Sequence, residues 1–319
     1  MDMIIIDGMS FAMPLFIMAV GGIFCERSGV TMLALEGLQG FGAFTGALAV
    51  ILLRPVLGDS FQLMIYIAMA AAMLGGAIYS LLHAVLCVRF KAGQTISGVV
   101  VNILAVALTA FFTSVINRAL TGSATNRFQI GVSHRFTVPG ISGIPFVGAF
   151  FKNVYPFEVV ILVLAAFAWY LFYKTRFGLR LRACGDNPHS LDAAGGNVGA
   201  TRVKAIMITG ALSGLAGMCF AYSIMANFSP SIYMGYGYLS IAAMIFGNWE
   251  ILTTLAVCLF IGFAKSSGYQ LCLVLGMSSN FSDLFLILPY VLTLLSLIFF
   301  SKHNHPPRAI GQIFDKSNG

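Results

Sequence analysis

The chain has 319 residues, of which 59% are hydrophobic and only 9% are charged, and its mean hydropathy is +0.91. Because a soluble domain carries about 25% charged residues, this composition excludes a water-soluble globular protein. The formal net charge of +7 does not indicate a nucleic-acid partner, because the basic residues lie in short connections between apolar runs, where they set topology. No segment alternates apolar and polar residues as a membrane β-barrel does. We therefore expect an all-α bundle of transmembrane helices in contact with membrane lipids.

A helix needs about 20 apolar residues to cross a bilayer. The segment 236–249 is too short to span alone, and we expect it to cross as part of a broken helix or to form a re-entrant segment. The sequence therefore predicts about eight to ten spans. The first apolar run lacks the preceding basic segment of a signal peptide, so it is expected to be retained in the mature protein. The long apolar runs are 9–25, 31–53, 61–88, 96–116, 157–173, 203–223, 251–274 and 281–300.

The distribution of Lys and Arg favours nine crossings, with the N-terminus outside and the C-terminus inside. Of the 18 basic residues, twelve then lie on the cytoplasmic side, five lie outside and Lys265 lies within a span. Residues 1–302 are expected to form the transmembrane domain, with an external loop at 117–156 and a cytoplasmic loop at 174–202. Residues 303–319 are expected to form a short solvated cytoplasmic tail.

The first polar motif follows the first apolar run. Glu36 and Gln39 are three residues apart, so on a helix they share one face. A carboxylate in an apolar run usually faces a bundle interior or a water-filled pathway, which makes both residues candidates for a translocation path. The alternative is that Glu36 pairs with Arg27 near the cytoplasmic interface and only stabilises the fold. The surrounding small residues, which are typical of close helix packing, are Gly37, Gly40, Gly42 and Gly46.

Other polar residues interrupt the later spans. Singly, such residues usually form interhelical hydrogen bonds that stabilise a bundle. Lys265 is different because it lies well inside 251–274 and needs a partner or water; Glu250 and Asp283 are the candidate partners, and snorkelling is the alternative. The further candidates for the translocation path are Gln94, Ser97, Asn102 and Asn248.

Two further segments carry local signals. In 174–202, Asn187 is a good N-cap, Pro188 suits a first helical residue and Gly195 suits a helix end. These residues predict a short amphipathic surface helix, which either docks a soluble partner or is simply a capped connection. The glycine-interrupted run 228–249 resembles the broken helices that line transporter cavities, although its aromatic residues also fit an interfacial belt.

Catalytic and metal-binding motifs are missing from the sequence. It contains no G-x-x-x-x-G-K-[ST], H-E-x-x-H or G-x-S-x-G motif, so the chain is expected to bind no ATP through a P-loop and not to be an enzyme. Its six cysteines include no C-x-x-C pair, which leaves no metal or disulfide framework to infer. We expect no cofactor in this chain.

Taken together, several motifs make the chain similar to a known family over about residues 10–300. It resembles the permease subunits of bacterial ABC importers for nucleosides and simple sugars, which are related to the ribose and branched-chain amino acid permeases. The resemblance is to the shorter permease of nucleoside systems that use a basic-membrane-protein-type binding lipoprotein. Lys265 and Gly196 depart from the residues expected there. The matching stretches are 26–30, 35–37, 94–102, 176–183, 185–188, 194–195, 213–217, 242–249 and 288–290.

The resemblance implies a multi-pass protein of the bacterial inner membrane that translocates nucleosides or a related sugar-containing solute. It implies three kinds of partner: a second, longer permease, ABC ATPase subunits that bind the ATP, and an external substrate-binding lipoprotein. Residues 185–195 would be the cytoplasmic coupling helix. An ion-coupled secondary transporter is the alternative, and an intramembrane enzyme or structural subunit is a third class. The residues assigned to coupling are Arg180, Arg182, Gly185, Asp186, Asn187, Pro188, His189, Ser190, Leu191, Asp192, Ala194 and Gly195.

Overall fold

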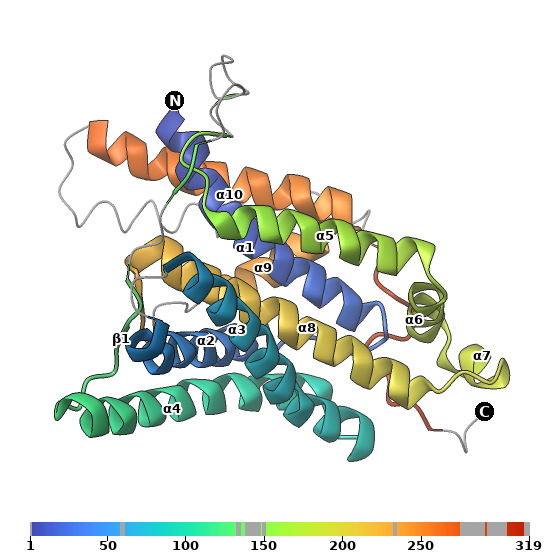
Figure 1. Ribbon diagram of the computed structural model, residues 1–319. Helices are drawn as coiled ribbons and strands as arrows, with labels where there is room; N and C mark the ends of the chain where they lie inside the picture. The colour runs from blue at the N-terminus through green and yellow to red at the C-terminus, as the bar shows by residue number, and fades with distance from the viewer. Residues whose placement is uncertain are drawn as a thin grey trace.

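Helices make up most of the molecule (Figure 1). The computed structural model describes residues 2–57, 61–131, 135–137, 148, 151–231, 235–274, 291 and 305–315. The helices are α1 (Asp2–Glu26), α2 (Leu35–Leu57), α3 (Phe61–Ala84), α4 (Gln94–Thr121), α5 (Pro156–Lys174), α6 (Arg176–Asp186), α7 (Pro188–Ala193), α8 (Val198–Phe220), α9 (Tyr236–Phe246) and α10 (Ile251–Val274). Short π-helices, η1 (Val85–Arg89) and η3 (Ala221–Met225), extend α3 and α8, and two strands, β1 (Phe128–Gln129) and β2 (Asn227–Phe228), pair with each other.

Seven helices among the described residues are long and apolar enough to cross a membrane, which confirms the predicted polytopic helical bundle. They correspond to the first seven predicted runs, and the eighth run, 281–300, lies outside the described residues. The first span is longer than predicted, because α1 already begins at Asp2. The protein is therefore a multi-pass membrane protein.

The centre of the bundle is built on close contacts between small residues. α8 runs through the middle of the molecule and packs against α1, α2 and α3 (Figure 1). A Cβ atom added at Gly42 would overlap the backbone of Gly214, and one added at Gly76 would overlap Gly210. Such approaches maximise van der Waals contact where lipid supplies no hydrophobic driving force. The predicted packing role of the α2 glycines holds for Gly37, Gly42 and Gly46 but not for Gly40, which has no atom within 4 Å of an added Cβ.

An irregular segment, 27–34, separates α1 from α2 inside the bundle. The apolar run beginning at residue 31 predicted a helix there, but α2 begins at Leu35. The backbone N–H of Thr31 donates to the Gln94 side chain (2.7 Å), and the carbonyl of Leu33 accepts from the Asn102 side chain (2.8 Å). Because these side chains satisfy its backbone, the segment remains non-helical away from water.

α9 covers only part of the bundle. Its first residue, Tyr236, places its ring 5.1 Å from that of Phe11, about half way along α1. Just beyond its other end, the indole of Trp249 donates to Glu26, the last residue of α1 (2.6 Å). The chain between η3 and α10 thus descends to the end of the bundle where α1 finishes, as the broken-helix prediction requires and the re-entrant alternative does not.

The two ends of the bundle carry different elements. α6, α7 and the C-terminal segment 305–315 lie at the end where α1 finishes, while the N-terminus lies at the opposite end (Figure 1). The backbone N–H of Ala309 donates to the carbonyl of Gly185 (2.8 Å), and that of Gly311 donates to Gly29 (3.1 Å). These hydrogen bonds hold the segment against the bundle, where Pro307 and Ala309 are buried, while residues 305, 306, 308 and 311–313 are exposed.

Candidate functional site

The first candidate site surrounds the N-terminus of α9. Gly235 precedes the helix with a φ of +97°, a left-handed conformation that suits glycine, and it has no side chain with which to cap the helix. Glu36 supplies the cap from the start of α2: its two carboxylate oxygens accept from the backbone N–H groups of Gly235 (2.6 Å) and Gly237 (2.7 Å). A carboxylate here satisfies otherwise orphaned donors and complements the helix dipole. The alternative pairing with Arg27 is wrong, because Arg27 donates to the carbonyls of two other residues, Asn248 and Trp249.

Asn102 ties this cap to α4. Its side-chain oxygen accepts from the backbone N–H of Gly37 (2.7 Å), and its amide donates to the carbonyl of Leu33 (2.8 Å) and to the hydroxyl of Tyr238 (3.2 Å). Asn102 is buried, so each of these hydrogen bonds satisfies a group that is withdrawn from water. Three elements, α2, α4 and α9, therefore meet at one amide.

Lys265 reaches the same helix start from α10. Its Nζ donates to the hydroxyl of Tyr236 (3.0 Å) and lies 3.6 Å from the centroid of the Phe11 ring. Within the described part of the chain, no carboxylate lies within 4.0 Å of this nitrogen, so Glu250 is not its partner; the other candidate, Asp283, lies outside the described residues. Aromatic rings and a hydroxyl thus hold the amine inside the bundle.

The remaining path candidates lie outside this network. Gln94 accepts from Thr31 (2.7 Å), and Ser97 shares a hydrogen bond with His83 (2.9 Å). Both fit the interhelical structural role that isolated polar residues usually have. Gln39 is fully buried in α2. Asn248 lies at the far end of α9, with a φ of +52°, and accepts from the backbone N–H of His305 (2.8 Å).

Sequence reasoning treated Tyr236 and Tyr238 only as aromatic residues, although their hydroxyls connect Lys265 and Asn102 to α9. The available signal was their position directly beside glycines in an interrupted helix. Glu26, the last residue of α1, accepts hydrogen bonds from the indole of Trp249 and from the backbone N–H of Met32. Glu26 therefore connects the irregular segment 27–34 to the residues just beyond α9.

The second candidate site is the surface formed by α6 and α7. As predicted, Asn187 caps α7 by accepting from the backbone N–H of Ser190 (3.1 Å), and Pro188 is the first helical residue. The helix ends at Ala193, and Gly195 follows with a φ of +77°. This local chemistry makes α7 a short, well-defined projection from the bundle.

α7 has one buried face and one exposed face. Leu191 packs with Cys184 and Val198, and Phe314 of the C-terminal segment covers this small cluster. Burial raises the pKa of the Cys184 thiol, which therefore remains a neutral packing group. Gly185 and Pro188 are also buried, and Arg182 and Asp192 are half-buried. The exposed members of the predicted coupling set are Arg180, Asp186, Asn187, His189, Ser190, Ala194 and Gly195.

The C-terminal segment forms a clasp, defined here as residues 305–315, across this surface. Arg202, at the start of α8, donates to the carbonyl of Gln312 (3.0 Å), and Lys91 forms an ion pair with Asp315 (2.8 Å). The ring of Phe314 lies 5.1 Å from that of His189 on α7. Sequence reasoning missed this contact. The sequence feature that could have indicated it is a single aromatic residue, Phe314, in an otherwise largely polar segment.

At the opposite end, a two-stranded sheet joins two connections that are distant in sequence. β1 pairs antiparallel with β2, so that Phe128 faces Phe228, and both rings pack near Phe44 of α2. Both strand phenylalanines are fully buried. The predicted external loop 117–156 is thereby anchored to the connection that leads from η3 into α9.

A multi-pass helical bundle in which one helix starts inside the bundle, on a network of polar side chains, has the architecture of a membrane transporter. The chain belongs to the family described as branched-chain amino acid transport system, permease component, whose pattern matches residues 4–297. No solved structure matches the chain.

Curated relatives cover nearly the whole chain. It is 36% identical to the guanosine ABC transporter permease protein NupQ of Bacillus subtilis, over 94% of this chain and 92% of that protein. It is 33% identical to the nucleoside ABC transporter permease protein NupC of Lactococcus lactis, over 99% and 98% of the two chains. Similarity extends at 25% identity to a second Bacillus subtilis protein, the guanosine ABC transporter permease protein NupP, over 85% and 75%.

Proposed function

We propose that this chain is the permease subunit of an ATP-binding-cassette importer that carries nucleosides into the cell. The observation that carries the proposal is the full-length similarity to two permeases whose names specify guanosine and nucleosides. Within this proposal the chain itself binds no ATP. Separate ATPase subunits bind and hydrolyse it on the cytoplasmic side.

The α6–α7 surface is the proposed contact for the ATPase. Its exposed polar residues lie opposite a buried apolar face that packs against the bundle. A force applied to the exposed side is therefore passed to the bundle. α7 leads directly into α8, which runs through the centre of the bundle to η3. Gly185 also lies against the backbone of Arg27 and accepts from Ala309, which connects the same surface to the end of α1. These contacts support a lever that moves several helices together.

The network at α9 is the proposed element that responds to this lever. Its N-terminus depends on side chains from α2, α4 and α10. A relative movement of those helices therefore changes the hydrogen bonds that Glu36, Asn102 and Lys265 make to α9. Helix termini inside a bundle are where transporters place substrate-facing groups. The path through the permease is proposed to bind substrate weakly, because an external lipoprotein supplies the affinity.

The remaining partners follow from the proposal. A second, longer permease is proposed to complete the pore, which agrees with the similarity to NupP as well as to NupQ. The external lipoprotein is proposed to dock where β1 and β2 bring the loop 117–156 against the connection after η3. Both assignments follow from the same importer assembly.

Reconstitution tests the proposal directly. The chain is co-purified with its second permease, ATPase and binding lipoprotein, and uptake of radiolabelled guanosine, uridine and ribose into proteoliposomes is measured. We expect nucleoside uptake that requires ATP and disappears with an ATPase subunit unable to hydrolyse it. Uptake by the purified chain alone, driven by a proton or sodium gradient, would instead establish the ion-coupled alternative.

A further inference from the structure

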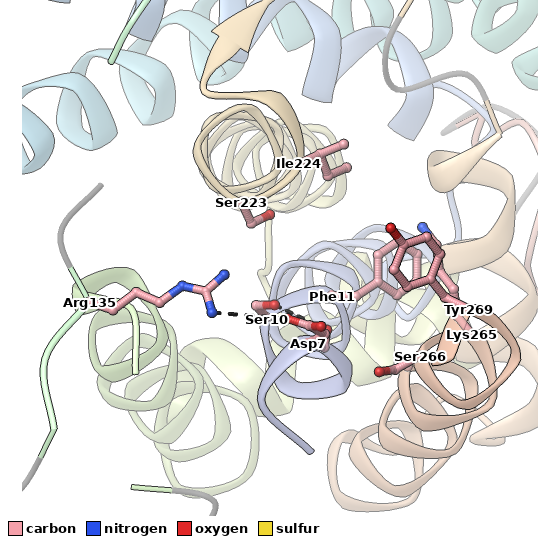
Figure 2. Close-up of a pocket in the computed structure, with 10 residues that line it drawn as sticks. Asp7, Ser10, Phe11, Arg135, Ser223, Ile224, Lys265, Ser266 and Tyr269 are labelled. Atoms are coloured by element: carbon pink, nitrogen blue, oxygen red, sulfur yellow. Dashed lines mark hydrogen bonds and ion pairs between the residues drawn. The ribbon is translucent and has the colours of Figure 1, made fainter. Parts of the chain in front are cut away.

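A pocket lies between α1, η3 and α10, next to the described part of the external loop (Figure 2). Its cavity volume is about 210 Å³, which is smaller than the range of about 300–1,000 Å³ typical of ligand pockets and suits a small, flat group. Figure 2 shows Ser10 and Asp7 of α1 between Arg135 on one side and Lys265 and Tyr269 on the other. The pocket is separate from the Glu36 cap, but Lys265 belongs to both.

The inner wall of the pocket carries hydrogen-bond donors. Ser266 is only 6% exposed, and its hydroxyl has no hydrogen-bond partner among the described residues. The hydroxyl of Ser223 is also buried and lacks a partner in the same part of the chain. Most buried polar groups in proteins are satisfied, so two such hydroxyls in one pocket indicate a site that receives acceptor atoms. Lys265 stands directly beside Ser266 and adds an amine.

The backbone of the pocket is also specialised. Ser223 lies in η3, where the α8 helix changes to π-helical turns before the chain leaves the bundle. Single π-helical turns inside or at the end of α-helices occur frequently at functional sites. Here the wider turn carries Ser223 on the wall that faces α1.

The mouth of the pocket is polar. Arg135 and Asp7 approach to 4.0 Å, with side chains 34% and 41% exposed, and Ser10 donates to the carbonyl of Asp7 (3.0 Å). Asp7 is near the start of α1, so the pocket opens toward the end of the bundle that holds the N-terminus. That end is the predicted outer side, from which an imported solute arrives.

The exposed ring of Tyr269 adds flat apolar surface to these donors. A ligand that matches this lining has an aromatic face for the ring and several acceptor atoms for the hydroxyls and the amine. We propose that this pocket binds the nucleobase of an incoming nucleoside, with Ser223, Ser266 and Lys265 donating to its carbonyl oxygens and ring nitrogens. The inference rests on the proposed nucleoside import and assigns a substrate-contacting site within it.

Paired serine variants test the assignment in the complete transporter. Ser266→Ala and Ser223→Ala each remove one donor, whereas Ser267→Ala changes the neighbouring serine, which is exposed on α10. Losing one hydrogen bond worth about 0.5–1.5 kcal/mol corresponds to a change of about 2–12-fold in affinity. Because the lipoprotein is proposed to supply the affinity, it also sets the KM of the complete transporter. We therefore expect the first two variants to lower the maximal rate of guanosine uptake by up to about this factor, and Ser267→Ala to leave the rate unchanged.

A second measurement does not depend on transport rates. In a background without the six native cysteines, Ser266→Cys is labelled from outside with a membrane-impermeant thiol reagent, with and without guanosine. We expect guanosine to slow this labelling and to leave unaffected the labelling of Lys152→Cys, a partly exposed position at the same end of the bundle. A side chain with a purely structural role would not give this protection.

The outcomes separate the two proposals. If the wild-type transporter takes up no nucleoside, the proposed function is wrong. If wild-type uptake is normal, but both pocket variants keep the wild-type maximal rate and guanosine gives no protection at Ser266→Cys, the pocket assignment alone is overturned. Protection together with the expected fall in the maximal rate supports both.

Discussion

Two helix N-termini in this molecule are capped in opposite ways. α7 is capped by Asn187, three residues from the N–H that it satisfies, whereas α9 is capped by Glu36, which lies 199 residues away from Gly235 in sequence. The local cap makes α7 a self-contained projection on the surface. The distant cap makes the start of α9 a junction whose integrity depends on how α2 and α9 are placed.

The difference separates a helix that is stabilised by its own neighbours in sequence from one that is stabilised by other helices. A locally capped helix keeps its shape while it moves as a unit, which suits a surface on which a partner acts. The start of α9, in contrast, is held by hydrogen bonds from side chains of α2, α4 and α10. These hydrogen bonds change when any of the three helices moves. The four predictions that follow test this contrast, from the largest expected effect on uptake to the smallest.

Glu36→Ala should have the largest effect. The backbone N–H groups of Gly235 and Gly237 would lose their acceptor, and a buried donor without a partner costs about 1–3 kcal/mol. We expect uptake to fall more than about tenfold and the purified complex to melt at a lower temperature. Gly40→Ala on the same helix, where an added Cβ meets no atom within 4 Å, serves as the control. It should leave both uptake and the melting temperature unchanged. Wild-type uptake and stability in Glu36→Ala would show that the cap is dispensable.

Arg180→Glu should impair coupling without unfolding the protein. Arg180 is exposed on α6, and exposed substitutions usually change stability by less than about 0.5 kcal/mol. Reversing a charge at a protein interface weakens association, so we expect ATP-driven uptake to fall by about fivefold with unchanged melting. Arg89→Glu, at another exposed position on the predicted cytoplasmic side, should retain most activity. Equal losses in the two variants would indicate a general topology effect instead of a specific contact.

Asn187→Ala should loosen α7 alone. An N-cap of this kind contributes about 1 kcal/mol, which is enough to increase local opening while the bundle remains folded. We expect faster hydrogen exchange confined to 188–193 and a loss of uptake of about threefold. Asn187→Asp keeps the acceptor and should behave like the wild type. Faster exchange spread through α8 would contradict the idea of a self-contained projection.

Phe314→Ala should give the smallest effect. The Phe314 ring covers the cluster around Leu191 and lies beside His189, so its removal weakens the clasp on α7. Because the ring is only partly buried, we expect a loss of about twofold in uptake and slightly faster exchange at 188–193. The adjacent Ile313 is 50% exposed, and Ile313→Ala should leave both measurements unchanged. A larger defect in Ile313→Ala would contradict the assigned packing.

Local chemistry explains which features were predictable from the sequence. The spans follow from long apolar runs, and the α7 cap follows from Asn187 and Pro188, because each signal lies within a few adjacent residues. The cap on α9 joins Glu36 to Gly235, and the clasp joins Phe314 to α7. Neither pairing leaves a local pattern, so composition and spacing indicated that Glu36 was unusual without indicating its partner.

The prediction that the second span begins at residue 31 was wrong for a related reason. Residues 31–34 are mostly apolar and were assigned to the second span, but side chains from α4 supply the hydrogen bonds that a helix would otherwise provide. Tertiary contacts can override an apolar pattern wherever they satisfy the backbone. The same contacts place Asn102 between α2 and α9, a position that its own sequence neighbours do not reveal.

The most direct test of the proposed coupling is cross-linking at α7 in native membranes. Cysteine at Ser190, an exposed residue of this helix, is probed against cysteines on the co-expressed ATPase, with Lys152→Cys at the opposite end as the control. We expect a cross-link at Ser190→Cys whose yield changes when ATP is bound, and none at Lys152→Cys. Absence of any ATPase contact at α7, in membranes that still take up nucleosides, would contradict the proposed lever.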